Sequence, residues 1–289
     1  MSSGLERREV DLVVDHHGHD RHLWCDVEEP AEGGRGTLLI AHGFKGYKDY
    51  GMFPRLAHVA AQAGWAAVRF NFAHSGMTRN NETFERPDLF ALDTWNAQVR
   101  DLVHLVAAVR NGDLTTVAPK APILLLGHSR GGLASILAAG RGLDVDGVIS
   151  VSAPADPCRL SETHRRQLEE GRGVEVRSDR TGQTLLIGPP FLHEIQSDRS
   201  GHDGPAMARK MSVPLVVLHG LEDATVDVED ARVLASHAGV EPILIEGGNH
   251  VMNVVNPHEA SAPPSPQLAA VEAVLLEQLH RLEQEASSS

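Results

Sequence analysis

The sequence predicts an α/β fold in which a mostly parallel central sheet carries helices on both faces. Along the 289 residues, short apolar runs typical of buried strands alternate with segments of helical spacing. The chain opens with two strand-like segments around a polar turn, which predicts an antiparallel hairpin at the edge of the sheet. The composition does not shift midway along the chain, so we expect one domain.

The elements of the first half can be placed in order. The opening hairpin pairs residues 9–14 with 21–27 across a turn at 15–20 that holds three histidines. Three histidines are enough to bind a metal ion. We favour the interpretation that this turn is a mobile, solvated loop, and we assign no metal. The polar loop over 71–86 is long for a compact domain, and loops of this length usually have a function, so we expect it to line a site. The other elements are strands at 37–41 and 65–72 and helices at 54–63 and 93–110.

The second half continues the alternation with one interruption. Residues 155–211 break the pattern, with a polar helix at 161–170 and a hairpin over 174–187. We therefore expect a small cap insertion above the sheet, within a single domain of 1–289. Its apolar residues, Phe191 and Leu192 among them, either wall a substrate pocket or pack the cap onto the sheet. The remaining elements are strands at 123–126, 147–152, 213–219 and 242–245 and helices at 133–139, 228–238 and 267–283.

Ser129 stands between a buried strand and a helix, in the segment Gly127-His128-Ser129-Arg130-Gly131. A serine hydroxyl is a weak nucleophile until a base takes its proton, and a sharp strand-to-helix turn exposes the hydroxyl to such a base. The flanking glycines leave room for the strand and the helix to pass closely. This context predicts Ser129 as a catalytic nucleophile.

Two further loops supply what this nucleophile needs. In such sheets ligands bind at the carboxyl ends of the strands, so the loops after residues 41, 126, 219 and 245 should meet there. The last of these, Glu246-Gly247-Gly248-Asn249-His250, presents an imidazole that can accept the serine proton and return it to a leaving group. The loop after residue 219 offers Asp223 to orient that imidazole, with Glu222 and Asp227 as alternatives.

The loop after residue 41 has the sequence His42-Gly43-Phe44-Lys45-Gly46. We expect the backbone N–H groups of Phe44 and Arg130 to point at a developing oxyanion, and His42 to hold the loop. Four nearby polar side chains are compatible with an anionic substituent on a substrate, although we favour ordinary surface charge: Lys45, Tyr47, Lys48 and Arg79.

These motifs, in this order, resemble the α/β-hydrolase superfamily. The matching segments are His-Gly-Phe-Lys-Gly early, Gly-His-Ser-Arg-Gly in the middle, His-Gly-Leu-Glu-Asp-Ala-Thr-Val late and Gly-Asn-His near the end. Within the superfamily the chain resembles bacterial serine esterases of the dienelactone-hydrolase-like and cinnamoyl (feruloyl) esterase type, although dienelactone hydrolases proper carry cysteine where this chain has Ser129. The resemblance implies the α/β-hydrolase fold, a Ser129–His250–Asp223 triad, and Phe44 and Arg130 as oxyanion donors.

The expected function is a serine hydrolase that cleaves carboxylic esters through an acyl-enzyme and uses no cofactor. A peptidase or amidase of the serine aminopeptidase type is the alternative; amines leave less readily than alcohols, so this reaction needs firmer protonation of the leaving group. A binding protein on the same scaffold is the third hypothesis, because a fold does not dictate function. The presence of all three triad residues argues against it.

Composition narrows the partners and the compartment. The net charge of −13 argues against nucleic acid and anionic membranes as partners. The expected partner is the small-molecule ester that the hydrolase motifs imply. Residues 1–10 are charged, and no stretch approaches the roughly 18 apolar residues of a membrane span, so we expect a cytoplasmic protein. Cys25 and Cys158 are expected to be plain thiols. A homodimer is compatible with the sequence, which does not decide the oligomeric state.

Overall fold

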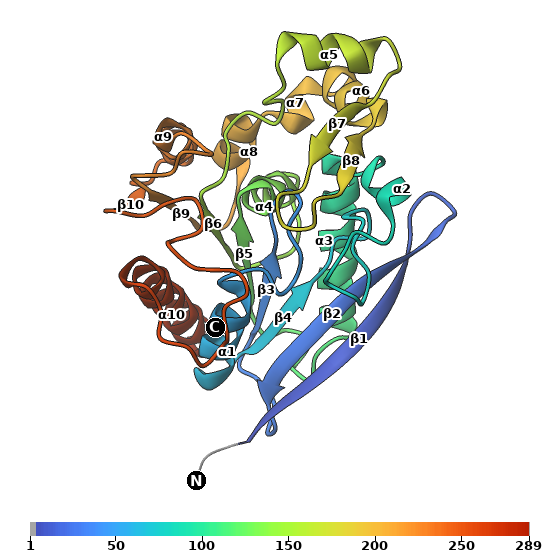
Figure 1. Ribbon diagram of the computed structural model, residues 1–289. Helices are drawn as coiled ribbons and strands as arrows, with labels where there is room; N and C mark the ends of the chain where they lie inside the picture. Colours follow the sequence, from blue (N-terminus) through green and yellow to red (C-terminus); the bar gives the residue numbers. More distant parts are fainter. Residues whose placement is uncertain (1–3, 289) are drawn as a thin grey trace.

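The computed structural model describes residues 4–288 and is built around an eight-stranded sheet (Figure 1). The strand order is β1-β2-β4-β3-β5-β6-β9-β10, and the pairs from β4 to β10 are parallel. The hairpin β1–β2 is antiparallel and joins β4 in the antiparallel sense, so the predicted mixed edge is confirmed. The strands are β1 Leu5–Asp15, β2 Asp20–Pro30, β3 Thr37–Ala41, β4 Ala66–Phe70, β5 Ile123–His128, β6 Gly147–Val151, β9 Leu215–Gly220 and β10 Ile243–Ile245.

Helices cover both faces of this sheet, as the alternation predicts. Successive side chains of a strand point to opposite faces, so Leu38 and Leu39 of β3 belong to two different hydrophobic cores. Helices α1 (Phe53–Gln62) and α10 (Pro266–Ser287) close the core of Leu38. The core of Leu39 is closed by α3 (Trp95–Asn111), α4 (Arg130–Gly140), α8 (Gly204–Lys210) and α9 (Val228–Ala238). Within residues 4–288, no helix is long and apolar enough to cross a membrane.

The turn of the opening hairpin differs from the prediction. His16 is buried, its Nε2 lies 2.6 Å from Oδ1 of Asp101 on α3, and its ring centroid lies 4.7 Å from that of His74. The expectation of a mobile, solvated loop is therefore wrong for His16, because this side chain pins the turn to α3. His17 and His19 are exposed, as solvated turn residues would be.

The predicted insertion contains a hairpin and short helices beyond the end of the sheet, where Figure 1 shows α5, α6, β7 and β8 together. The hairpin is confirmed: Val174 lies opposite Ile187, and Arg177 lies opposite Thr184. Helix α8 falls inside the predicted range but packs against α4 and α9, so it belongs to the helix layer of the sheet. The other elements are α5 Glu162–Glu169, β7 Val174–Arg177, β8 Thr184–Ile187, α6 Pro189–Ser197 and α7 Arg199–His202.

The long loop over 71–86, which leads into α2 (Pro87–Phe90), supports the hairpin of the insertion. The Phe84 N–H donates to Oε1 of Gln183 at 2.8 Å, and Nε2 of Gln183 donates back to the Phe84 carbonyl at 3.1 Å. Nη1 of Arg180 donates to the Asn81 carbonyl at 2.7 Å. Neither of the two pockets beside Ser129 is lined by residues 71–86, so the loop supports the walls of a site and does not line it as expected.

Candidate active site

Ser129 occupies a strained turn between β5 and α4. Its φ is +53° and its ψ is −121°, a conformation that costs free energy for a residue with a side chain. The flanking glycines explain how the turn closes. A Cβ added to Gly127 would lie 2.3 Å from the Gly131 carbonyl oxygen, and one added to Gly131 would lie 2.4 Å from that of Ala41. Only glycine fits at these two positions, and Ser129 stands between them at the apex of the turn.

Asp223 and His250 come from the loops after β9 and β10 and meet directly. Nδ1 of His250 lies 2.8 Å from Oδ2 of Asp223. An ionised carboxylate only accepts hydrogen bonds, so the proton of the neutral imidazole sits on Nδ1, and Nε2 keeps its lone pair. Ser129 and His250 line the same pocket of about 160 Å³. A serine, an imidazole and a carboxylate are thus gathered at the carboxyl ends of β5, β10 and β9.

The Asp223 carboxylate is held from several sides. Its Oδ1 accepts the backbone N–H groups of Thr225 at 2.8 Å and Val226 at 2.9 Å, and its Oδ2 lies 3.3 Å from Nε2 of the buried His219. Burial by itself would raise the pKa of Asp223, but the hydrogen bonds from His219, His250 and Val226 outweigh burial and hold the pKa well below its usual range. The carboxylate of Asp223 is therefore ionised at neutral pH, where it accepts the hydrogen bond from Nδ1 of His250.

The two alternatives to Asp223 lie elsewhere. Glu222 is exposed to solvent. Asp227 caps α9, because its Oδ1 accepts the Glu229 N–H at 2.9 Å.

A second histidine positions the loop of His250. Nε2 of His128 lies 2.8 Å from the His250 carbonyl oxygen, and the two ring centroids are 4.8 Å apart. Burial, together with the nearby His250, lowers the pKa of His128 to about 3, so at neutral pH it donates an N–H to that carbonyl without carrying a charge. The sequence analysis missed His128 and His219. Both are the last or next-to-last residue of a strand that feeds a predicted catalytic loop, and this position is the signal that could have found them.

The loop after β3 lies against the nucleophile. A Cβ on Gly43 would come within 3.0 Å of the Ser129 Cβ, which puts this backbone in contact with the serine. His42 holds the loop: Nδ1 lies 2.8 Å from the Gly43 carbonyl oxygen, and Nε2 accepts the Phe72 N–H at 3.2 Å. Burial lowers the pKa of His42 to about 4, which keeps it neutral in this structural position.

Phe44 and Arg130, the two expected oxyanion donors, both lie next to Ser129. Arg130 is the first residue of α4, and N–H groups in the first turn of a helix have no partner within the helix. The positive end of the helix dipole adds to the attraction for a developing negative charge. Phe44, Ser129 and Arg130 line one pocket together.

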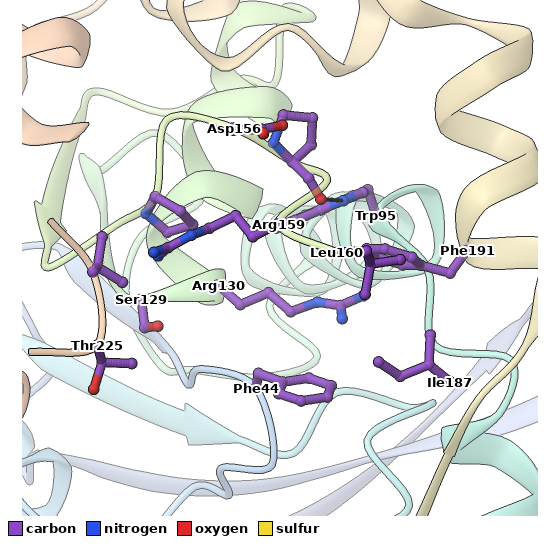
Figure 2. A pocket seen from close by; sticks show the side chains of 13 residues that line it. Phe44, Trp95, Ser129, Arg130, Asp156, Arg159, Leu160, Ile187, Phe191 and Thr225 are labelled. Atoms are coloured by element: carbon purple, nitrogen blue, oxygen red, sulfur yellow. Dashed lines mark hydrogen bonds between the residues drawn. The ribbon is translucent and has the colours of Figure 1, made fainter. Parts of the chain in front are cut away.

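That pocket has a volume of about 360 Å³ and walls that are mostly aromatic and aliphatic (Figure 2). Phe44 and Trp95 come from the body of the protein, whereas Ile187 and Phe191 come from the insertion. Phe191 therefore lines the pocket. Leu192 does not: it lines a separate pocket with Leu168 and Pro189, away from Ser129.

The smaller pocket, which contains His250, has more polar walls. Lys45 and Tyr50 line it on one side, and Ser178, Asp179 and Arg180 at the tip of the β7–β8 hairpin line it on the other. The Arg180 guanidinium lies over the ring of Tyr47 at 4.4 Å from its centroid, which fixes the hairpin tip.

Two of the basic residues that the sequence offered for an anionic substituent are engaged away from Ser129. Lys48 is buried and pairs with Asp26 at 2.6 Å and Asp49 at 2.7 Å. Arg79 lies over the ring of Trp24 and pairs with Glu9 at 3.3 Å. The guanidinium groups that do line the pockets are those of Arg130, Arg159 and Arg180, which the sequence analysis did not single out as side chains.

Most of the chain matches the model of one known protein family. The model described as the alpha/beta hydrolase family matches residues 38–262, a range that includes Ser129, Asp223 and His250. The chain belongs to this hydrolase family. No curated protein matches the sequence.

Solved structures of low sequence identity share the fold. Est1E from Butyrivibrio proteoclasticus is 17% identical, with 94% of this chain and 98% of that chain covered and a TM-score of 0.64. The esterase domain of a Rhodothermus marinus protein is 21% identical, with coverages of 96% and 98% and a TM-score of 0.63. A dienelactone hydrolase from Anabaena variabilis is 17% identical, with coverages of 94% and 96% and a TM-score of 0.55. These likenesses show the α/β-hydrolase fold.

Proposed function

We propose that this hydrolase cleaves carboxylic esters through an acyl-enzyme on Ser129, with His250 as the base and Asp223 as the third member of the triad. The observation that carries the proposal is the 2.8 Å contact between Nδ1 of His250 and Oδ2 of Asp223, in a loop cluster that also holds the strained Ser129. This arrangement leaves Nε2 of the imidazole as the proton acceptor. The esterase names of two structural neighbours support the choice of substrate.

The reaction proceeds in two halves. Nε2 of His250 takes the hydroxyl proton while Oγ of Ser129 bonds to the ester carbonyl carbon, and the carbonyl oxygen becomes an oxyanion facing the N–H groups of Phe44 and Arg130. The oxyanion collapses, the bond from carbon to the alcohol oxygen breaks, and His250 gives its proton to that oxygen. Water then attacks the acyl-enzyme with the same proton transfers, which releases the acid and restores the serine.

The position of His250 supports a role for each of the two pockets. Because His250 must protonate the alcohol oxygen, the leaving group belongs on its side, in the polar pocket of about 160 Å³. The acyl group then occupies the pocket of about 360 Å³, which Ser129 lines and His250 does not. We therefore assign an apolar, aromatic-walled pocket to the acyl part and a polar pocket to the alcohol.

The test combines labelling with a substrate panel. An alkyl fluorophosphonate should add once, at Ser129, and Ser129→Ala should lose both labelling and hydrolysis by several orders of magnitude with an unchanged melting temperature, because the serine contributes little buried area. Activity of Ser129→Ala within a factor of about ten of wild type would remove Ser129 from this role.

The panel separates esters from amides. It contains p-nitrophenyl esters of rising chain length, methyl hydroxycinnamates and aminoacyl anilides. We expect cleavage of esters, whose alcohol leaves more readily than an amine. Faster turnover of the anilides would reassign the protein to the peptidase and amidase alternative with the same triad.

A further inference from the structure

The side chain of Arg130 is an unusual wall for an apolar pocket. It is only 7% exposed, and its guanidinium carbon lies 4.8 Å from the ring centroid of Trp95, 5.1 Å from that of Phe191 and 5.6 Å from that of Phe44. Figure 2 shows it extending from beside Ser129 into the pocket, between Phe44 and Leu160. A charged group has thus been taken out of water and surrounded by rings, next to the nucleophile.

Among residues 4–288, only one nitrogen of this guanidinium finds hydrogen-bond partners. Nη2 donates to the Asp93 carbonyl at 3.1 Å and lies 3.4 Å from Oδ2 of Asp93. Within residues 4–288, Nε and Nη1 have no hydrogen-bond partner. Asp93 engages a single nitrogen, whereas a guanidinium is built to hold a carboxylate through two. A buried donor without a partner, such as Nε, is rare in native structures and calls for an explanation, and a role in ligand binding is one such explanation.

The carboxylate beside Arg130 is buried as well. Burial raises the pKa of Asp93 to about 6, although Arg130 and the amide of Gln98 act in the opposite direction. The interior therefore opposes the negative charge that Arg130 needs beside it.

Two other charged side chains line the pocket. Arg159 lines it too, and its closest acid is Asp230, with Nη1 and Oδ2 3.9 Å apart. Asp156 is the single carboxylate among the lining residues, and its Oδ1 already accepts the Cys158 N–H at 2.8 Å. The lining residues thus carry two guanidinium groups and one carboxylate, while Asp93 and Asp230, the acids paired with the two guanidinium groups, do not line the pocket.

We propose that Arg130 makes the acyl pocket selective for esters whose acyl part ends in a carboxylate, that is, for monoesters of dicarboxylic acids. This inference rests on the proposed function, because it assigns the large pocket to the acyl group. The aromatic and aliphatic walls hold the carbon chain, and Nη1 of the guanidinium, which makes no hydrogen bond to residues 4–288, donates to the terminal carboxylate. Arg130 then acts twice, through its backbone N–H on the oxyanion and through its side chain on the far end of the acyl group.

The test is a pair of matched substrate series. The first contains monomethyl esters of straight dicarboxylic acids from succinate to suberate, and the second contains methyl esters of monocarboxylic acids of equal chain length. For wild type we expect kcat/KM to favour the carboxylate series at one or two chain lengths. Arg130→Met should lower that ratio by roughly ten- to a hundredfold, because a hydrogen bond to a charged group in a buried site is lost.

Two further variants control the result. Arg130→Met leaves Asp93 unpaired, so the double variant Arg130→Met/Asp93→Asn removes the buried charge as well and should show the same loss of ratio. Arg159→Met, at a side chain that is 42% exposed, should change the ratio by a much smaller factor.

Binding separates this inference from the proposed function. In the full chain carrying Ser129→Ala, calorimetric titration with monomethyl suberate and with methyl octanoate measures selection without turnover. Tighter binding of the carboxylate ester, lost when Arg130→Met is added, supports the inference even if the protein hydrolyses neither ester. Equal binding of the two esters, or a preference that survives Arg130→Met, overturns it even if ester hydrolysis is established.

Discussion

The loops at the carboxyl ends of the strands and the insertion over 155–211 build two different parts of the same site. The loops place Ser129, Asp223 and His250 within a few residues of a strand end, and they are packed so closely that a Cβ on Gly127 or Gly131 would not fit. The insertion supplies side chains such as Ile187 and Phe191 as pocket walls. The proposed catalytic groups are thus placed by the backbone of the sheet, whereas the walls of the pocket are formed by packed side chains.

The largest expected effect tests the backbone-held part. Asp223→Asn should lower kcat by about 10⁴, by analogy with the serine-protease template, because an amide in place of the carboxylate favours the wrong imidazole tautomer. Its neighbour Glu222 is exposed and offers a matched control, so Glu222→Gln should leave kcat unchanged. Steady-state kinetics on one activated ester measure both variants. A large effect of Glu222→Gln with a small effect of Asp223→Asn would show that the carboxylate that matters is one residue away.

The sequence could predict that these loops come together, for a physical reason. The hydrophobic pattern reveals where each strand ends, and parallel strands bring their carboxyl ends to one edge, so loops far apart in the chain are brought together by topology alone. The segment Gly127 to Gly131 adds steric limits that leave few conformations open. His16 was misjudged because its partner, Asp101, lies on a helix 85 residues away, and periodicity carries no information on such a contact.

The pocket walls were less predictable. Arg130 appeared in the sequence as a backbone donor, yet its side chain lies among the rings of Phe44, Trp95 and Phe191, which come from three separate elements. Phe191 and Leu192 are adjacent on α6 and equally apolar, and only the orientation of that helix decides that one lines the pocket and the other does not. Side-chain packing between distant segments fixes these outcomes.

The pair Phe191 and Leu192 gives the second prediction. Phe191→Ala should change the ratio of kcat/KM between long or aromatic acyl esters and acetate esters by about 1–3 kcal/mol of discrimination, because it removes an apolar wall of the acyl pocket. Leu192→Ala should lower the melting temperature with little change in that ratio, since Leu192 is buried and does not line the pocket of Ser129. Equal changes in ratio for the two variants would mean that the insertion acts on substrates only through its stability.

The smallest expected effect concerns acid stability, and it again separates the two regions. His42 and His128 are buried beside Ser129, and burial lowers the pKa of His42 to about 4 and that of His128 to about 3. In the unfolded chain each returns to about 6.5. Because the folded pKa is depressed, the stability that each contributes is complete above pH 6.5 and is lost as the pH falls toward the folded pKa. Asp93, whose pKa is raised by burial to about 6, opposes this loss over part of the same range.

One substitution measures the contribution of His42 to this pH dependence separately from those of His128 and Asp93. Between pH 6 and pH 4.5 each of the two histidines should add about 1 kcal/mol per pH unit to the slope of the unfolding free energy, somewhat below the limit of about 1.4 for a full proton, so His42→Gln should flatten the slope by about 1 kcal/mol per pH unit, whatever it does to stability at neutral pH. His164, exposed on α5 of the insertion, is the matched control, and His164→Gln should leave the slope unchanged. Urea unfolding at a series of pH values measures all three proteins. A slope that His42→Gln leaves intact would show that the loop after β3 does not keep this imidazole neutral.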